Sequence, residues 1–260
     1  MFEIIPNLLE LIIENLELLL LFFGIALLYS SVGFGGGSSY LAIMALFNFD
    51  FKVLRAVSLL CNITVVSNGT LQFYRKDLLN LKKVMPLVIA SVPMAFLGGK
   101  MAISEKTFFI LLGITLLLAA ILLWFQPQKR AINITNISDK IGFNAFLGGT
   151  IGFLSGMVGI GGGIFLSPVL NMLNWDNPKN IAATASFFIL VNSVAGLLGQ
   201  ATTFPADLPW MLVFFLMISV GIGGFLGTYL ATNKFSQIWV RKATAILIAY
   251  VSYTVLNKNL

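Results

Sequence analysis

Long apolar runs separated by short polar segments limit most strongly how this chain can fold. These runs lie near residues 17–47, 56–72, 84–102, 107–125, 141–173, 181–200, 208–231 and 243–256. Most have about the 20 residues that a helix needs to cross a hydrocarbon layer. They lack the alternation of barrel strands, and backbone polar groups in lipid must bond internally, so the spans are helices. The sequence therefore predicts an all-α integral membrane protein, with about eight apolar helical stretches in a single transmembrane domain over 1–260.

The composition argues against a soluble enzyme and a nucleic-acid binder. The chain is 58% hydrophobic and 10% charged, whereas a soluble domain carries about 25% charged residues. Its net charge of +6 comes from short basic clusters between apolar runs, which indicate membrane topology and predict no nucleic-acid partner. Cys61 is the only cysteine and histidine is absent, which excludes a disulfide framework, a His/Cys zinc site and a His-based triad. We expect no catalytic residues, no metal and no other cofactor.

The second half of the chain repeats motifs of the first half. Gly33-Phe34-Gly35-Gly36-Gly37 recurs as Gly159-Ile160-Gly161-Gly162-Gly163, at an offset of 126. At the same offset Asn48-Phe49-Asp50 matches Asn174-Trp175-Asp176, and Ala56-Val57-Ser58 matches Ala182-Ala183-Thr184. Phe96-Leu97-Gly98 then matches Phe225-Leu226-Gly227 at an offset of 129. Residues 16–126 and 140–257 are therefore predicted to be internal repeats joined by a polar linker.

The distribution of Lys and Arg predicts how the repeats are oriented, because these residues prefer cytoplasmic loops. If every apolar stretch crosses the membrane once, they divide eight against eight. If each glycine-bearing stretch instead returns to the side from which it started, the division is eleven against five, the eleven being Arg75, Lys76, Lys82, Lys83, Lys129, Arg130, Lys140, Lys179, Lys234, Arg241 and Lys242. The second arrangement makes the linker cytoplasmic, both termini extracytoplasmic and the halves inverted-topology repeats, as in many secondary transporters.

The two G-x-G-G-G motifs allow three interpretations. A nucleotide-binding loop is disfavoured, because neither copy precedes Lys-Ser/Thr and both lie inside apolar runs. Close helix packing through small residues could by itself explain the glycines. Alternatively, the glycines interrupt the helix and leave unpaired N–H groups at the start of a half-helix, which is a favourable place for an anion. No Asp, Glu, Lys or Arg lies deep in a predicted span, so backbone amides would replace a buried cation there.

The candidate substrate-binding residues are these glycines and the polar side chains near them: Gly33, Gly35, Gly36, Gly37, Ser38, Ser39, Asn62 and Asn68 in the first half, and Gly159, Gly161, Gly162, Gly163, Thr184 and Asn192 in the second. The alternative role of each hydroxyl or amide is a hydrogen bond that joins two helices. Arg55 is the nearest fixed cation, at the expected outer end of the second span. It is a candidate for attracting an anion, with a topology or headgroup contact as the alternative.

The chain resembles the TauE/SafE sulfite exporter-like family of membrane permeases. The resemblance rests on the two glycine motifs, on Pro168 after the second, and on the short loop and Ala-x-Ser/Thr helix start that follow each copy. The first copy has Ala42 where the second has Pro168. The resemblance covers essentially the whole chain. It implies export or uptake of small sulfur-containing anions, such as sulfite, sulfoacetate or other organosulfonates, across the bacterial inner membrane.

Together these features predict a multi-pass secondary transporter of the inner (plasma) membrane. Its expected partners are a small sulfur-containing anion and the lipid bilayer. An anion channel and a membrane-embedded enzyme or assembly factor are the alternatives, although an enzyme would normally place ionisable residues together inside its spans. The transport direction, the coupling ion and the oligomeric state, including a homodimer, are left open.

Overall fold

The computed structural model describes residues 4–125, 141–205, 207–233 and 237–259, and this part of the chain is helical without a strand. Six of its helices are long and apolar enough to cross a membrane: α4 (Phe51–Arg75), α5 (Leu81–Lys100), α6 (Glu105–Trp124), α8 (Ile141–Val158), α10 (Pro178–Gly199) and α11 (Trp210–Asn233). Large apolar side chains such as Phe146 and Ile89 lie exposed on their outer faces, where lipid covers them. The predicted all-α membrane protein is confirmed.

Two of the long apolar runs are interrupted at their glycine motifs. The first contains α2 (Leu16–Ser30) and α3 (Gly37–Leu46), and the second contains α8 and α9 (Gly163–Met172). We call residues 31–36 the first break and residues 159–162 the second break. Gly36 and Gly162 precede α3 and α9 with φ of 91° and 85°, which glycine adopts far more readily than residues with a side chain. The remaining helices are α1 (Ile4–Glu14), η1 (Gln200–Thr202) and α12 (Gln237–Asn259).

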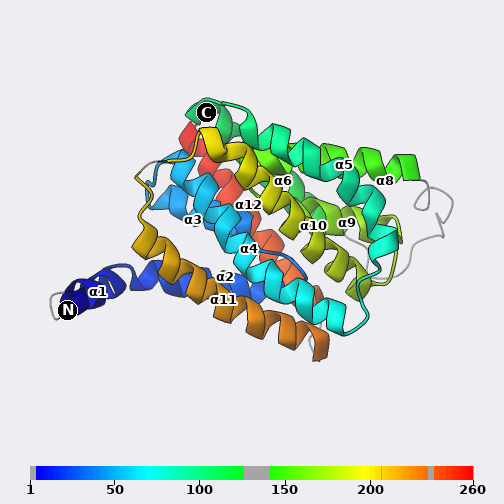
Figure 1. The fold of residues 1–260 in the computed structure, drawn as a ribbon, viewed down its shortest axis with the longest axis horizontal. Helices are drawn as coiled ribbons and strands as arrows, with labels where there is room; N and C mark the ends of the chain where they lie inside the picture. The colour runs from blue at the N-terminus through cyan, green and yellow to red at the C-terminus, as the bar shows by residue number, and fades with distance from the viewer. Residues whose placement is uncertain (1–3, 126–140, 206, 234–236, 260) are drawn as a thin grey trace.

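Each broken run turns back at its break, as Figure 1 shows. Helix α2 runs from left to right in this view and α3 returns to the left, whereas α8 runs from right to left and α9 returns to the right. Helix α1 and the end of α12 lie at the left, while the α4–α5 and α9–α10 connections lie at the right. Corresponding helices of the two halves therefore run in opposite directions.

The two halves interlock, because helices of one half pack most extensively against helices of the other half. Helix α5 packs most extensively against α8, and α11 correspondingly packs against α2. The contacts are close enough to require glycine: a Cβ on Gly98 would lie 2.2 Å from the Phe153 carbonyl oxygen, and a Cβ on Gly227 would lie 2.2 Å from the Leu27 carbonyl oxygen. Gly227 follows Gly98 at the sequence offset of 129 and Phe153 follows Leu27 at the offset of 126, so matched positions of the two halves make similar contacts.

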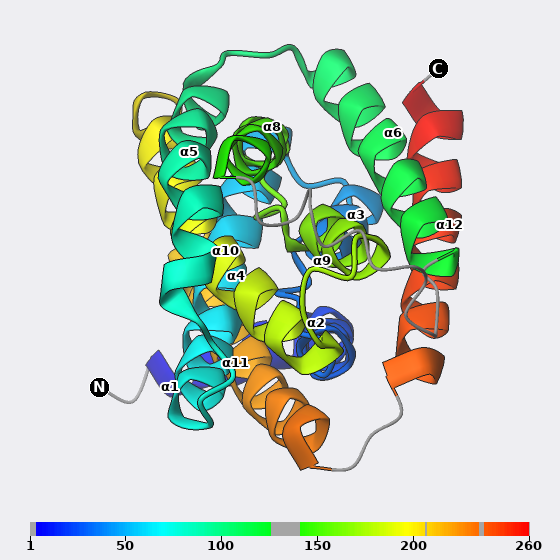
Figure 2. The ribbon, with the colours of Figure 1, turned by 90° about the vertical axis from the view of Figure 1, so that its right-hand side faces the viewer.

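Seen along the helix axes, α3 and α9 occupy the middle of the bundle and the longer helices surround them (Figure 2). Helices α6 and α12 pack together along one side. At the face with the α9–α10 connection, Lys83 Nζ lies 3.2 Å from Asp176 Oδ2 and 4.2 Å from the centre of the Trp175 ring. Because α3 and α9 lie in the middle of the bundle, both helix breaks lie in its interior, away from the connections at its two ends.

Candidate functional site

Asn62, on α4, connects the two glycine motifs in the centre of the bundle. Its side-chain oxygen accepts a hydrogen bond of 2.9 Å from the Gly37 N–H, and its side-chain nitrogen donates one of 2.9 Å to the Ile160 carbonyl. The side chain is fully buried. Gly37 and Ile160, which are 123 residues apart in the sequence, therefore meet at one carboxamide. The Gly37 amide, which we expected to be free for an anion, is occupied in this conformation.

Ser58 makes a second connection one turn earlier on α4. Its hydroxyl lies 2.9 Å from the Gly37 carbonyl oxygen and 3.0 Å from that of Gly159, so its one proton is shared between the two motifs. Ser58 is also fully buried. Ser58 and Asn62 lie on one face of α4, and this face holds the breaks together.

The second break keeps unpaired hydrogen-bond donors. The N–H groups of Gly161 and Gly162 have no acceptor among the described residues, and the first N–H groups of α9 have no partner within their helix. Ser193 and Ser155 hydroxyls are buried beside them without a partner. A Cβ on Gly161 would lie 2.9 Å from Ser193 Oγ, and a Cβ on Gly162 would lie 3.2 Å from Ser155 Cβ. Unpaired backbone and side-chain donors therefore lie near the start of α9, together with the apolar side chains of Ile189 and Phe188.

The N–H groups of Gly35 and Gly36 in the first break likewise have no acceptor among the described residues, but Gly37 and Ser39 at the start of α3 have partners within the protein. The Ser39 hydroxyl is 2.6 Å from the Tyr29 hydroxyl, so its hydrogen bond joins α3 to α2. Ser38 is buried in the first turn of α3. A Cβ on Gly35 would lie 2.3 Å from Asn62 Oδ1, and a Cβ on Gly36 would lie 2.7 Å from the Tyr40 hydroxyl, which is buried and unpaired. Side chains thus fill the space in front of α3.

Other candidate residues lie around this centre without joining it. Gly33 packs against the backbone of Ala182 on α10, while Gly159 packs against the backbone of Arg55 on α4. Asn68 is only partly buried, and no hydrogen bond joins it to either break. Thr184 is buried on α10. Asn192, also on α10, donates to the Phe188 carbonyl of its own helix at 2.7 Å and leaves its side-chain oxygen unpaired.

Arg55 lies in the second turn of α4 and is far more buried than a topology or headgroup contact requires. Only 3% of the residue is exposed. Its Nη2 donates to the Gly99 carbonyl at 3.3 Å, at the end of α5, and its Nε is buried without a partner. The sequence identified Arg55 but not its burial.

Our sequence-based set of site residues omitted Ser58, Ser155, Ser193 and Tyr40. A signal for Ser58 was available, since it lies four residues before Asn62 and aligns with Thr184 in the repeat. Ser193 directly follows Asn192, which was in the set. No comparable signal points to Ser155 or Tyr40, because their positions depend on how α8 and α3 fold back at the breaks.

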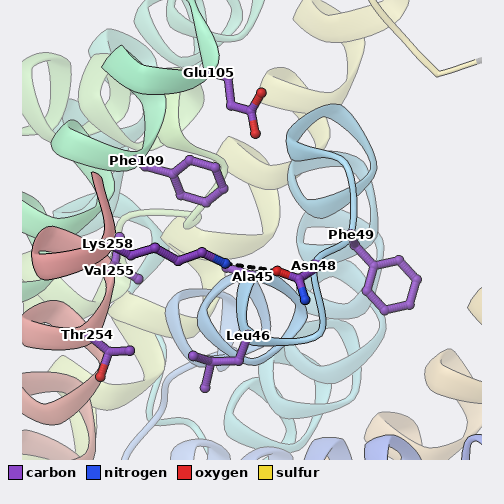
Figure 3. A pocket seen from close by; sticks show the side chains of 9 residues that line it. All are labelled: Ala45, Leu46, Asn48, Phe49, Glu105, Phe109, Thr254, Val255 and Lys258. Carbon is purple, nitrogen blue, oxygen red and sulfur yellow. Dashed lines mark hydrogen bonds between the residues drawn. The ribbon is translucent and has the colours of Figure 1, made fainter. Parts of the chain in front are cut away.

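A separate pocket opens between the end of α3, the start of α6 and the end of α12 (Figure 3). Lys258 Nζ donates to Asn48 Oδ1 at 2.8 Å across it, and Glu105 lies on its rim. None of its lining residues belongs to either glycine motif: Ala45, Leu46, Asn48, Phe49, Glu105, Phe109, Thr254, Val255 and Lys258. This pocket is therefore distinct from the central site.

Comparison with known proteins places the chain among membrane transporters. The family described as "Sulfite exporter TauE/SafE" matches residues 18–255. The chain is 33% identical over 240 residues to "Probable membrane transporter protein y4hK" of Sinorhizobium fredii, covering 90% of this chain and 95% of that protein. It is 26% identical over 219 residues to "Probable membrane transporter protein YunE" of Bacillus subtilis, covering 76% of this chain and 79% of that protein.

A further relative is longer than this chain. "Probable membrane transporter protein MamO" of Paramagnetospirillum magneticum is 26% identical over 238 residues, which cover 75% of this chain and 37% of MamO. No solved structure matches the chain significantly. The family match spans both glycine motifs and nearly the whole helical bundle, so the chain belongs to the TauE/SafE sulfite exporter family of membrane transporters.

Proposed function

We propose that this transporter is a secondary carrier of a small anion, sulfite or an organosulfonate, which binds between the two glycine-broken helices at the second break. The observation that carries the proposal is the group of unpaired donors at the second break. Gly161 and Gly162 present N–H groups where α9 begins, and the Ser193 hydroxyl lies beside them without a partner. The macrodipole of α9 adds partial positive charge at this end. An anion would satisfy all of these groups at once.

The arrangement of the halves supports a carrier mechanism. Corresponding helices run in opposite directions and make equivalent contacts, which fits inverted-topology repeats over 16–126 and 140–257. In such transporters one repeat rocks against the other around a site where broken helices meet. Asn62 and Ser58 would act at this boundary, because their hydrogen bonds cross from one motif to the other. The family's description supports a sulfur oxyanion as the substrate.

The charged side chains support an orientation in the bacterial inner membrane. Among the described residues, the helix ends on the right in Figure 1 (the α4–α5 connection and the first turns of α10 and α12) contain Arg75, Lys76, Lys82, Lys83, Lys179 and Lys242, and the opposite ends of α4, α5, α6 and α12 contain Lys52, Arg55, Lys100, Lys106 and Lys258, a division of six against five. Of the predicted cytoplasmic set, Lys129, Arg130, Lys140 and Lys234 lie outside the described residues, and the side chain of Arg241 is not described. With the right-hand face in the cytoplasm, both termini are extracytoplasmic.

Counterflow in proteoliposomes tests the transport mechanism and the substrate. Vesicles loaded with unlabelled sulfite, methanesulfonate, sulfoacetate or sulfate would receive the same anion in labelled form outside. A carrier accumulates the label transiently because it exchanges one anion for another, whereas a channel equilibrates it without overshoot. We expect an overshoot with sulfite or a sulfonate. Equilibration without overshoot would establish the channel alternative, and no uptake of any of these anions would refute the proposed substrate class.

Ser193→Ala tests the location of the site. Its hydroxyl has no partner, so its removal should leave the melting temperature unchanged. Loss of a hydrogen bond to a charged ligand, about 1.5 kcal/mol, should weaken anion binding about tenfold. The matched control is Ser252→Ala, since Ser252 is equally buried but donates to the Gly113 carbonyl at 2.8 Å between α12 and α6. The control should lose stability and keep its affinity; unchanged affinity in Ser193→Ala would contradict the site.

A further inference from the structure

Arg55 carries a buried positive charge without a matching negative charge. Guanidinium has five N–H donors and stays protonated in proteins. Here one donor has an acceptor, the Gly99 carbonyl at a long 3.3 Å, and Nε has none. Only 3% of the residue is exposed, so little water reaches the group. The Nε–H group is therefore an unused donor inside the protein.

No carboxylate in the described part of the chain compensates this charge. Of the eight acidic side chains described there, seven are exposed, and the eighth, Asp176, pairs with Lys83 at the opposite face of the bundle. Burying an unpaired charge is strongly unfavourable, so such groups are retained where a partner binds or a function requires them. A mobile anion is the partner that fits this position.

The position of Arg55 relates it to the central site. Arg55, Ser58 and Asn62 occupy positions i, i+3 and i+7 on α4, and therefore form one polar stripe. Ser58 and Asn62 bind both glycine motifs, while the backbone of Arg55 contacts Gly159 at the edge of the second break. Seven residues of helix place Arg55 about 10 Å from Asn62 along the axis, toward the face that carries α1 and the end of α12.

The other half of the molecule has no equivalent stripe. At an offset of 126, the residues of α10 that correspond to Arg55, Ser58 and Asn62 are Ile181, Thr184 and Phe188. Ile181 and Phe188 are both fully buried. The charged stripe therefore leads from the centre toward one face only.

We infer that Arg55 forms a second anion site, between the face with the chain ends and the central site. Its ligand is a small oxyanion with two oxygens on one atom, such as sulfite, a sulfonate or a carboxylate, because the planar guanidinium binds such a pair in two parallel hydrogen bonds. The inference deepens the proposed function, since the same anion would pass from Arg55 to the second break. Anion binding at Arg55 can nevertheless be measured without a transport assay.

Isothermal titration of the purified full-length protein with methanesulfonate tests this site. We expect two bound anions per chain in the unmodified protein and one in Arg55→Gln. Arg55→Lys keeps the charge but loses the paired geometry, and should weaken this site about tenfold. The matched control is Lys52→Gln, which removes the same charge from the first turn of the same helix, where the side chain is exposed. Two sites in Arg55→Gln, or an equal loss in Lys52→Gln, would overturn the inference.

Ser193→Ala separates this inference from the proposed central site. If Arg55→Gln abolishes one binding event and Ser193→Ala weakens the other, both sites are supported. If one event is found and only Arg55→Gln removes it, the Arg55 site stands and the central site fails; if only Ser193→Ala affects it, the Arg55 inference is wrong. Should Arg55→Gln not fold, the rise in melting temperature on adding methanesulfonate is compared between Arg55→Lys and the unmodified protein. An equal rise would then count against the Arg55 site.

Discussion

Replacement of Asn62 by leucine tests whether the two glycine motifs are held together by one side chain. Leucine has a similar size but neither donates nor accepts hydrogen bonds. The substitution would remove both 2.9 Å bonds and leave the Gly37 N–H and the Ile160 carbonyl without their partner. Because Asn62 is completely buried, water cannot take its place without local opening. The variant should therefore lose stability even though its core becomes more apolar.

The expected loss follows from the two bonds. Hydrogen bonds between membrane helices average about 0.6 kcal/mol and reach about 1.7 kcal/mol, so two of them contribute about 1–3 kcal/mol. For a chain of this size one kcal/mol shifts the melting temperature by about 2–4 °C, which gives a decrease of roughly 2–12 °C. Thermal unfolding of the purified protein in detergent, followed by circular dichroism, would measure it.

Asn68→Leu is the matched control, because Asn68 lies on the same helix, is partly exposed and has no hydrogen bond to either break. Its melting temperature should equal that of the unmodified protein. Combining Asn62→Leu with Ser58→Ala should cost less than the sum of the single changes, since both side chains bind Gly37. If Asn62→Leu melted at the temperature of the unmodified protein, Asn62 would not hold the breaks together.

Two further changes test the packing and the orientation of the bundle. Gly98→Val should prevent accumulation of folded protein, because its Cβ would lie 2.2 Å from the Phe153 carbonyl oxygen, whereas Gly24→Val should accumulate normally, since nothing lies within 4 Å of a Cβ there; equal yields in a fluorescence-detected chromatography assay would contradict the α5–α8 contact. A reporter that is active only in the cytoplasm, fused to the carboxyl terminus, should be inactive, because the end of α12 lies opposite the face that the eleven-to-five division of Lys and Arg assigns to the cytoplasm; an active reporter would reverse the proposed orientation.

The helix breaks could be anticipated from the sequence because local chemistry determines them. Each apolar run is too long for one crossing, and the glycines supply the backbone conformations with positive φ found at Gly36 and Gly162. The pairing of α5 with α8 and of α11 with α2 was not predicted. In a membrane helix the face toward lipid and the face toward protein are both apolar, so hydrophobic periodicity does not identify the contact face. Only small residues such as Gly98 and Gly227 indicate where the helices approach.

The same difficulty explains which site residues were missed or misplaced. Asn62 and Asn68 are six residues apart on α4, so they point in directions that differ by about 120°, and only one can face the breaks. Sequence periodicity gave no means of choosing between them. Arg55 was expected near the outer surface, where long basic side chains usually reach water. Its burial depends on contact with Gly99 from α5, which the sequence of α4 does not contain.

A sequence difference between the two halves explains why the first N–H of α9 lacks the partner that the first N–H of α3 has. At the first break Asn62 accepts the hydrogen bond of Gly37, the first residue of α3. The residue equivalent to Asn62 in the other half is Phe188, whose apolar ring cannot accept the corresponding bond from Gly163 at the start of α9. The two halves thus have similar helix ends, and the phenylalanine in the second half leaves the Gly163 N–H without the carboxamide that binds Gly37. Phe188→Asn adds a carboxamide that should accept a hydrogen bond from the Gly163 N–H. Anion binding at the start of α9 should therefore become weaker.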